Sequence, residues 1–233
     1  MKTIDVCLSP ELIPLYNLEE KTVVVVDILR ATSCMVTAFA HGAESIKPIE
    51  NLDECRKMKV RGYIISGERD GKKVEDFDKG NSPFEYMGDQ VRGQKIAFTT
   101  TNGTLAIEKS KQAREIIVGS FLNLSSVVRY LLFSRNNILI VCAGWKGKVN
   151  LEDTLFAGAL VEKLKNHIEP DCDAPLIAQH LYNQSKNNLL AILETSSHVK
   201  RLNRLNIHKD IAFCLTEDQY HVVPKLVNNS LVC

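Results

Sequence analysis

The chain has 233 residues, of which 45% are hydrophobic and 24% are charged, so it is long enough to bury a substantial core. Its 29 basic and 28 acidic residues are mixed along the sequence and give a net charge of +1. This balance argues against the extended positive surface with which proteins bind nucleic acid. The N-terminus lacks the pattern of a secretion signal, and the apolar run at residues 23–26 is too short to span a membrane. We therefore expect a cytoplasmic protein without a membrane partner, and its assembly into homo-oligomers stays open.

Short apolar runs rich in β-branched residues alternate with segments of helical period, which is the pattern of an α/β fold. Strands are predicted at residues 3–8, 22–27, 44–48, 63–66, 95–99, 115–118, 137–142 and 210–215. Helices are predicted at residues 31–41, 52–60, 103–109, 124–133, 151–167, 175–194 and 197–205. Because no linker interrupts the alternation, we expect a single domain over residues 1–233. A helical C-terminal lobe could begin at about residue 171, where a stretch with two prolines breaks the helical pattern.

The seven cysteines are odd in number and lack metal-type spacing, which predicts reduced thiols. Cys55 and Arg61 have the bare spacing of a thiol phosphatase loop, but no glycine lies between them to let backbone amides converge on a phosphate. Cys34 and Cys142 lie in apolar stretches and are predicted to be small core residues rather than nucleophiles. A thiol mechanism is therefore disfavoured.

The first segment whose side chains could bind a ligand or take part in a reaction is an apolar strand that ends at Asp27. It leads through Arg30 to Thr32, Ser33 and a helix. Ligands of open α/β sheets gather at the carboxyl ends of strands. There, Asp27 could bind a hard cation through oxygen, and Arg30 could hold an anion with paired donors. A buried strand followed by a helix cap and a surface arginine explains the segment equally well.

The second segment is a long polar loop over residues 67–82, which follows a strand and contains Glu68, Arg69, Asp78, Asn81 and Ser82. Loops of this length inside compact domains are commonly functional. A solvated acidic loop is the alternative, and a serine before a proline is also the pattern of a helix N-cap.

The third segment is a strand-to-helix turn made of Thr100, Thr101, Asn102, Gly103 and Thr104. Hydroxyl groups, an amide and a glycine at such a turn could hold phosphate or carboxylate oxygens. The turn lacks the lysine of a nucleotide-binding P-loop, so nucleotide triphosphates are not supported. A run of N-capping residues is the structural alternative.

The fourth segment follows the strand at residues 137–142 and places Glu152 and Asp153 in the first turn of a helix. These carboxylates could reach a metal ion or a water molecule. Taken alone, they are better explained as ordinary partners of the helix dipole.

Four junctions of one kind, each bringing acidic, hydroxyl or guanidinium groups to a strand end, together predict an anion site that holds a divalent cation. The six histidines all lie outside these junctions, which argues against zinc and histidine-nucleophile sites. Each histidine is predicted to be a surface or capping residue.

In this order, the segments resemble the 2-phosphosulfolactate phosphatase family. The resemblance is carried by residues 24–32 (VVVDILRAT), 67–69 (GER), 77–83 (FDKGNSP), 99–104 (TTTNGT), 142–144 (CAG) and 151–153 (LED), and more loosely by 204–211 (RLNIHKDI) and 223–224 (VP). It spans residues 3–223. Asp76 and Lys79 depart from the glycine and the apolar residue that are usual in the family.

The resemblance implies a magnesium-dependent phosphatase with a layered α/β/α fold, which hydrolyses 2-phosphosulfolactate, or a similar phosphorylated hydroxy acid, on the way to coenzyme M. We expect catalysis by Asp27, Arg30 and Asp78. The expected Mg²⁺ ligands are Asp27, Glu68, Asp78, Glu152 and Asp153. The residues expected to bind the small anionic substrate are Thr32, Ser33, Arg69, Asn81, Ser82, Thr100, Thr101, Asn102, Gly103 and Thr104.

Two other functions fit the same residues. A non-catalytic sensor could bind a phosphorylated metabolite in such a site, and a phosphotransferase could pass the phosphoryl group to an acceptor alcohol. Within the phosphatase hypothesis, the attacking group is either water or a carboxylate such as Asp27.

Overall fold

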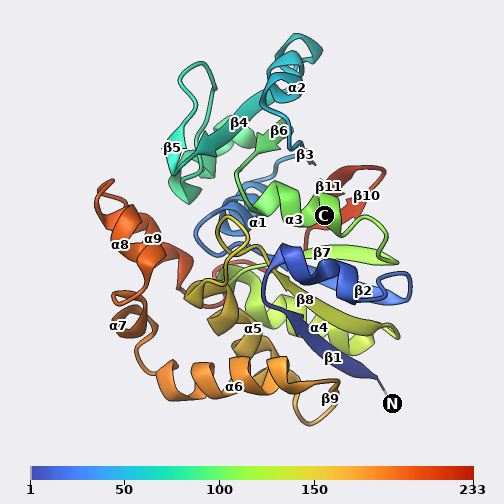
Figure 1. Ribbon diagram of the computed structural model, residues 1–233. Helices are drawn as coiled ribbons and strands as arrows, with labels where there is room; N and C mark the ends of the chain where they lie inside the picture. Colours follow the sequence, from blue (N-terminus) through green and yellow to red (C-terminus); the bar gives the residue numbers. More distant parts are fainter. Residues whose placement is uncertain (1) are drawn as a thin grey trace.

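The computed structural model describes residues 2–233, which form a layered α/β/α arrangement around an eleven-stranded mixed sheet (Figure 1). The strands are β1 (Thr3–Cys7), β2 (Lys21–Val26), β3 (Ser45–Pro48), β4 (Ile64–Arg69), β5 (Lys72–Lys73), β6 (Lys95–Thr99), β7 (Glu115–Gly119), β8 (Asn137–Cys142), β9 (Glu169–Pro170), β10 (Lys225–Val227) and β11 (Ser230–Val232). The α-helices are α1 (Ala31–Ala40), α2 (Leu52–Lys57), α3 (Gly103–Lys109), α4 (Leu124–Phe133), α5 (Leu151–Leu164), α6 (Asp173–Ser185), α7 (Leu189–Leu193), α8 (Ser197–Asn203) and α9 (His208–Cys214). The predicted fold class is confirmed.

The sheet consists of two parallel blocks, one made of β4, β6 and β3 and the other of β7, β2, β8, β1 and β9. The hairpin β10–β11 lies between them and pairs antiparallel with β7 on one side and with β3 on the other. The strands of the two blocks are therefore antiparallel to one another across the sheet. A twist of roughly 20–25° per strand pair adds up to roughly 100–125° between β6 and β2. Because of this twist, the carboxyl ends of both blocks turn toward the side where α8 and α9 lie (Figure 1).

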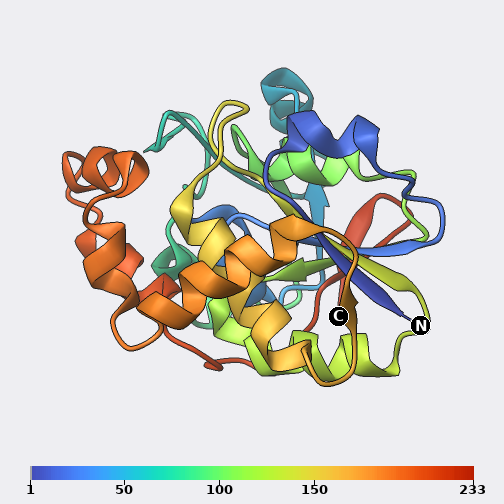
Figure 2. The ribbon, with the colours of Figure 1, turned by 60° about the horizontal axis from the view of Figure 1, so that its bottom comes forward.

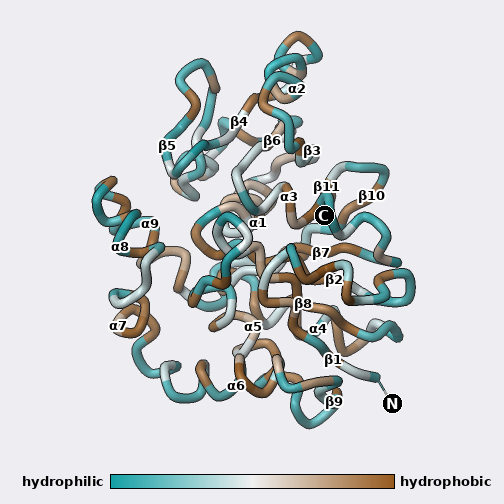
Figure 3. Tube along the Cα trace, in the orientation of Figure 1, coloured by the Kyte–Doolittle hydropathy of each residue, from teal (hydrophilic) through white to brown (hydrophobic). Residues whose placement is uncertain are grey.

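Helices cover both faces of the second block (Figure 2). Along β2, Val24 and Val26 pack into the core beneath α4, α5 and α6, whereas Val23 and Val25 pack into the core beneath α1 and α3. All four side chains are fully buried. An all-apolar strand is what burial on both faces requires, and Figure 3 shows β2 and β8 as hydrophobic tracts in the middle of the molecule.

Helix α6 packs closely along α5. A Cβ atom at Gly158 would lie 2.0 Å from the carbonyl oxygen of Ala178, so only glycine permits this approach. Beyond α6, the chain turns at Asn188 into α7, α8 and α9, which we call the C-terminal arm (residues 189–214). The arm lies at one edge of the molecule (Figure 1). The expected organisation of residues 1–233 as one domain stays a prediction.

Most predicted elements are confirmed, and the strands over Lys95–Thr99 and Asn137–Cys142 agree at both ends. The strand predicted at residues 210–215 is wrong, because this segment belongs to helix α9. Its buried residues Asp210, Ile211 and Cys214 share one helical face, and short apolar runs of this kind fit either structure. The helix predicted at residues 175–194 is broken at Asn188, whose side chain caps α7. In residues 2–233, no helix has the length and apolar character needed to cross a membrane.

Candidate active site

A small cavity lies where the ends of β2, β4, β6 and β8 meet the C-terminal arm. Its lining residues are Asp27, Leu29, Arg30, Glu68, Gly71, Asn81, Thr101, Asn102, Trp145, His198, Arg201 and Leu202. Its volume of about 20 Å³ leaves room for about one water molecule. The structure thus brings residues of all four predicted junctions together, and it adds residues of the arm.

Asp27 follows β2 directly and is 8% exposed. Its Oδ1 atom accepts a hydrogen bond from the Ala31 backbone amide at 3.2 Å, which ties the carboxylate to the start of α1. A Cβ atom at Gly103 would lie 2.8 Å from Asp27 Oδ2, so the glycine leaves room for this oxygen. Burial, together with the nearby carboxylates of Glu68 and Glu152, raises the pKa of Asp27 to about 6, although the Ala31 amide and His198 act in the opposite direction. The site therefore contains concentrated negative charge that a cation would relieve.

Arg30 is 5% exposed and forms a salt bridge with Asp210 of the arm. Its Nη2 atom also donates to the carbonyl oxygen of Gly71 at 3.3 Å. The guanidinium group consequently joins three segments that are distant in sequence. Its charge is largely balanced by Asp210, so Arg30 is a weaker anion receptor than its sequence position predicts.

Glu68 links the end of β4 to the turn after β6. One carboxylate oxygen accepts from the backbone amide of Thr101 at 2.8 Å, and the other accepts from the backbone amide of Gly71 at 2.6 Å. Glu68 is 6% exposed and lines the cavity. Two backbone donors keep its charge satisfied inside the protein.

Glu152 and His198 form a buried pair that the sequence did not predict. Oε1 of the fully buried Glu152 contacts Nδ1 of His198, and its Oε2 atom accepts no hydrogen bond from any group in residues 2–233. His198 is 7% exposed and lines the cavity, so the expectation of a surface or capping role is wrong for this histidine. It comes from α8, outside every strand junction, and it could have been found only by knowing that α8 packs over the site.

Arg201 and Trp145 close the cavity from the arm and from the loop after β8. The Arg201 guanidinium carbon lies 3.7 Å from the centre of the Trp145 ring, which is a cation–π contact. The same loop is held by a salt bridge of 2.8 Å between Lys146 and Asp70. Its Lys146 backbone amide also donates to Asn102 Oδ1 at 3.0 Å.

The oxygen atoms around the cavity suit a hard cation. Asp27 and Glu68 line it, and the buried Asn81 Oδ1 and Thr101 Oγ1 atoms have no hydrogen-bond partner among the described residues. Magnesium usually takes only one or two carboxylates and completes its shell with water and phosphate oxygens. In residues 2–233, no three side chains from histidine, cysteine, aspartate or glutamate converge as a ready-made metal cluster. The residues present therefore fit a cation that shares its ligands with water and substrate.

Asp78 and Asp153 do not reach the cavity. Asp78 is exposed, and its carboxylate pairs with Lys59 at 2.8 Å and accepts from the backbone amide of Ile65 at 3.0 Å. Asp153 is fully buried and accepts from the backbone amides of Ile28 and Gly144. Burial raises its pKa well above the usual range. Its role is to fasten the loops that follow β2 and β8.

Five of the predicted substrate-binding side chains are engaged elsewhere. Thr32 and Ser33 donate to backbone carbonyls of residues 27 and 28. Thr100 and Thr104 bond to one another's backbone across the turn. Arg69 donates to two backbone carbonyls and to the hydroxyl of Thr99. Ser82 also lies outside the lining, so that only Asn81, Thr101 and Asn102 of the predicted set line the cavity.

The thiols named above are buried. Burial raises the pKa of Cys55 to about 11 and the pKa of both Cys34 and Cys142 well above the usual range. These pKa values disfavour the thiolate form that a nucleophile requires.

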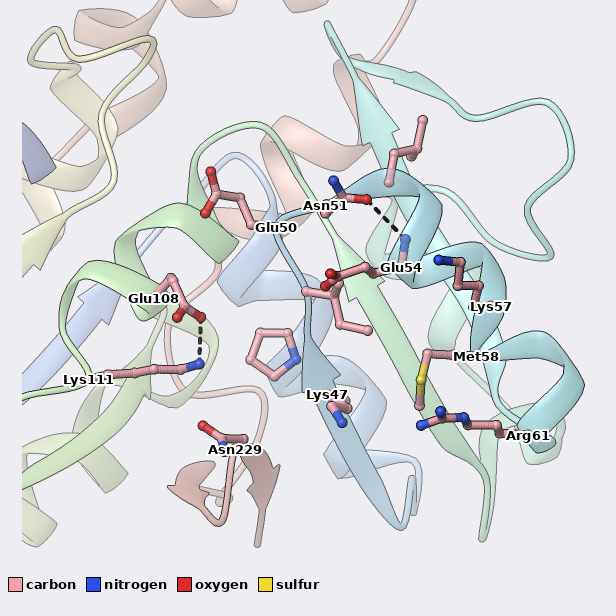
Figure 4. A pocket seen from close by; sticks show the side chains of 13 residues that line it. Lys47, Glu50, Asn51, Glu54, Lys57, Met58, Arg61, Glu108, Lys111 and Asn229 are labelled. Atoms are coloured by element: carbon pink, nitrogen blue, oxygen red, sulfur yellow. Dashed lines mark hydrogen bonds and ion pairs between the residues drawn. The ribbon is translucent and has the colours of Figure 1, made fainter.

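A much larger hollow lies elsewhere, between β3, α2 and α3 (Figure 4). It has a volume of about 1020 Å³ and carries side chains of both charges, among them Lys47, Glu54 and Arg61. Glu108 and Lys111 pair with one another at its edge. Because it lacks the buried, converging polar groups of the smaller cavity, we place the candidate active site at the strand ends.

Comparison with known proteins identifies the family of this chain. The family model described as 2-phosphosulpholactate phosphatase matches residues 7–229. A probable 2-phosphosulfolactate phosphatase of Thermotoga maritima is 44% identical over 219 residues, which cover 94% of this chain and 95% of the relative. Proteins of the same description from Caldanaerobacter subterraneus and Clostridium tetani are 43% and 32% identical, with coverage of 91% and 97% of this chain and 90% and 97% of theirs. The chain therefore belongs to the 2-phosphosulpholactate phosphatase family of phosphoric monoester hydrolases.

Proposed function

We propose that this protein is a Mg²⁺-dependent phosphatase that hydrolyses 2-phosphosulfolactate, or a closely similar phosphorylated hydroxy acid, to the alcohol and inorganic phosphate. The observation that carries the proposal is the buried Asp27 at the end of β2, surrounded by further oxygen atoms in a chain whose residues 7–229 match a phosphatase family. Seven unpaired cysteines suit a reducing compartment, so we also place the enzyme in the cytoplasm.

Asp27 and Asn81 are the best candidates to hold the cation, since Asp27 Oδ2 and Asn81 Oδ1 accept no hydrogen bond from the described residues. Glu68 would contribute through water, because both of its oxygens already accept backbone amides. Mg²⁺, when bound, supplies charge neutralisation at the phosphate oxygens and orients the attacking group.

His198 is placed to handle a proton. Glu152 holds its Nδ1 atom, which fixes the ring and leaves Nε2 free in a residue that lines the cavity. An imidazole oriented by a carboxylate is a common device for delivering a proton to a leaving oxygen atom. The hydroxyl of Thr101 and the amide of Asn102 lie beside it as donors for phosphate oxygens.

The proposal is tested by measuring phosphate release from 2-phosphosulfolactate with the purified chain, in Mg²⁺ and in EDTA. We expect release that EDTA abolishes and added Mg²⁺ restores. Tight binding of the ester without release would indicate a sensor, and release only after an acceptor alcohol is added would indicate a phosphotransferase. Either result would overturn the assignment.

A further inference from the structure

Arg201 is a cation at the cavity that forms no salt bridge with any residue of 2–233. Arg30 is paired with Asp210, and Arg69 points to backbone carbonyls away from the cavity. Arg201 lines the cavity, and its buried Nε atom has no hydrogen-bond partner in the part of the chain that the structure describes. The carboxylates of Glu68, Asp70 and Glu152 act on it only through space, and burial lowers its pKa. A buried, unpaired guanidinium donor is costly unless a ligand satisfies it.

The proposed substrate carries more than one negative group. Beside the phosphate, 2-phosphosulfolactate has a carboxylate and a sulfonate, whose oxygens match the fork of a guanidinium group. The phosphate is accounted for by the cation and by the donors near Asp27. A second anion then has to be balanced by a different positive charge, and Arg201 is the cavity-lining arginine whose charge is not already paired.

We propose that Arg201 binds the second anionic group of the substrate, the sulfonate or the carboxylate, and so selects phosphate esters that carry one. This inference rests on the proposed function. It makes Arg201 a specificity-determining residue and places it on the C-terminal arm, outside the strand junctions.

The stack of Arg201 on Trp145 also bears on how the substrate enters. The cavity has room for about one water molecule, far less than the ester needs. Arg201 and Trp145 come from different segments, α8 and the loop after β8, and both line the cavity while they contact one another. Admission of the substrate therefore requires the lining to move, and we expect the Arg201–Trp145 stack to change when it does. Trp145 is the single tryptophan of the chain, so its fluorescence reports this event directly.

The first test compares two esters in wild type, Arg201→Gln, Arg201→Lys and Arg204→Gln. Arg204 is exposed on the same arm and serves as the matched control. Loss of a charge-assisted contact predicts a KM for 2-phosphosulfolactate that is roughly 10- to 100-fold higher in Arg201→Gln. The loss of kcat/KM for phenyl phosphate, which has no second anion, should be at least tenfold smaller. Arg201→Lys should fall between, and Arg204→Gln should match wild type.

Equal losses for both esters in Arg201→Gln would overturn the inference, because they would show a general structural effect. An unchanged KM for 2-phosphosulfolactate would overturn it as well. The same variants with 2-phospholactate, which lacks the sulfonate, identify the anion bound: a retained dependence on Arg201 assigns the carboxylate, and a lost dependence assigns the sulfonate.

A second test does not depend on turnover. Sulfolactate, which carries both anions but no phosphate, is titrated into each variant while Trp145 fluorescence is recorded, with inorganic phosphate as the comparison ligand. We expect a fluorescence change and binding that weakens roughly 10- to 100-fold in Arg201→Gln for sulfolactate and much less for phosphate. If wild type binds sulfolactate in this way but hydrolyses no ester, the proposed function fails and the Arg201 assignment stands. If wild type hydrolyses the ester and Arg201→Gln binds sulfolactate as tightly as wild type, the assignment fails alone.

Discussion

The two sides of the candidate site are built differently. On one side, strands of the sheet place Asp27, directly after β2, and Glu68, at the end of β4, and the loop that follows β5 adds Asn81. On the other side, the short helices of the C-terminal arm deliver His198 and Arg201 through a few polar and stacking contacts. The sheet side thus supplies the proposed cation ligands, and the arm supplies the proposed proton donor His198 and the proposed anion receptor Arg201.

The same contrast separates the two kinds of charge. Asp27 and Glu68 sit at strand ends, where burial and the neighbouring carboxylates raise the pKa of Asp27. The arm carries Arg201, which pairs with no carboxylate of residues 2–233, and the paired cation Arg30 joins the two sides through Asp210. Substitutions of the cation ligands and of His198 should therefore affect turnover most, whereas substitutions of Arg201 and Asp210 should affect substrate choice and stability.

The largest expected effect is that of Asp27→Asn. Loss of the carboxylate removes the main proposed cation ligand, so we expect phosphate release to fall roughly 1000-fold. Asp78→Asn is the matched control, because Asp78 was an equally strong candidate in the sequence but is exposed and paired with Lys59. Its rate should stay within a few-fold of wild type. Steady-state assays in saturating Mg²⁺ decide the matter, and a larger loss in Asp78→Asn would reverse the assignment of the two residues.

The next effect concerns the salt bridge between Arg30 and Asp210, which joins the two sides of the site. Asp210→Asn leaves the guanidinium of Arg30 buried without its counter-ion, which should lower the free energy of unfolding by about 3–5 kcal/mol. Urea unfolding gives this value, and the surface variant Asp89→Asn, whose ion pair with Arg92 is exposed, should change it by less than about 1 kcal/mol. A similar value for both variants would show that the arm is not held by the Arg30 salt bridge.

The sequence predicts the strand-end side of the site better than the side formed by the C-terminal arm. Local patterns sufficed for the strands over Lys95–Thr99 and Asn137–Cys142 and for the gathering of Asp27, Glu68 and Thr101, because β-branched runs and polar residues at strand ends are local signals. They could not pair Arg30 with a residue 180 positions away. They also missed His198, since nothing near it in the sequence marks α8 as the wall of a site.

A further expected effect is on the pH dependence of stability. The pKa of Asp27 is raised from 3.8 to about 6 in the folded state, so folding binds its proton more tightly. The associated stability is complete below pH 3.8 and is lost as the pH rises through about 6, with a total of up to about 3 kcal/mol. In EDTA, Asp27→Asn should therefore be more stable than wild type at pH 8. This difference in stability should become smaller as the pH falls toward 4. Thermal unfolding of the two proteins across this pH range measures the difference, and a difference in stability that does not change with pH would contradict the raised pKa of Asp27. Adding Mg²⁺ at pH 8 should stabilise wild type and leave the variant unchanged.

The smallest effect tests how closely the strand-end side is packed. A Cβ atom at Gly103 would lie 2.6 Å from the Cβ of Ala31 and 2.8 Å from Asp27 Oδ2, so Gly103→Ala must displace one of them. We expect phosphate release to fall roughly tenfold, because misplacement of a catalytic group by a fraction of an ångström weakens catalysis, with an unfolding cost of about 1–3 kcal/mol from overpacking. The double variant Gly103→Ala/Ala31→Gly removes the contact between the two Cβ atoms but keeps the contact with Asp27. Recovery of stability without recovery of rate in this double variant would show that the position of Asp27 sets the rate. Recovery of both would show that the helix contact alone was disturbed, and that the strand end tolerates more movement than its packing indicates.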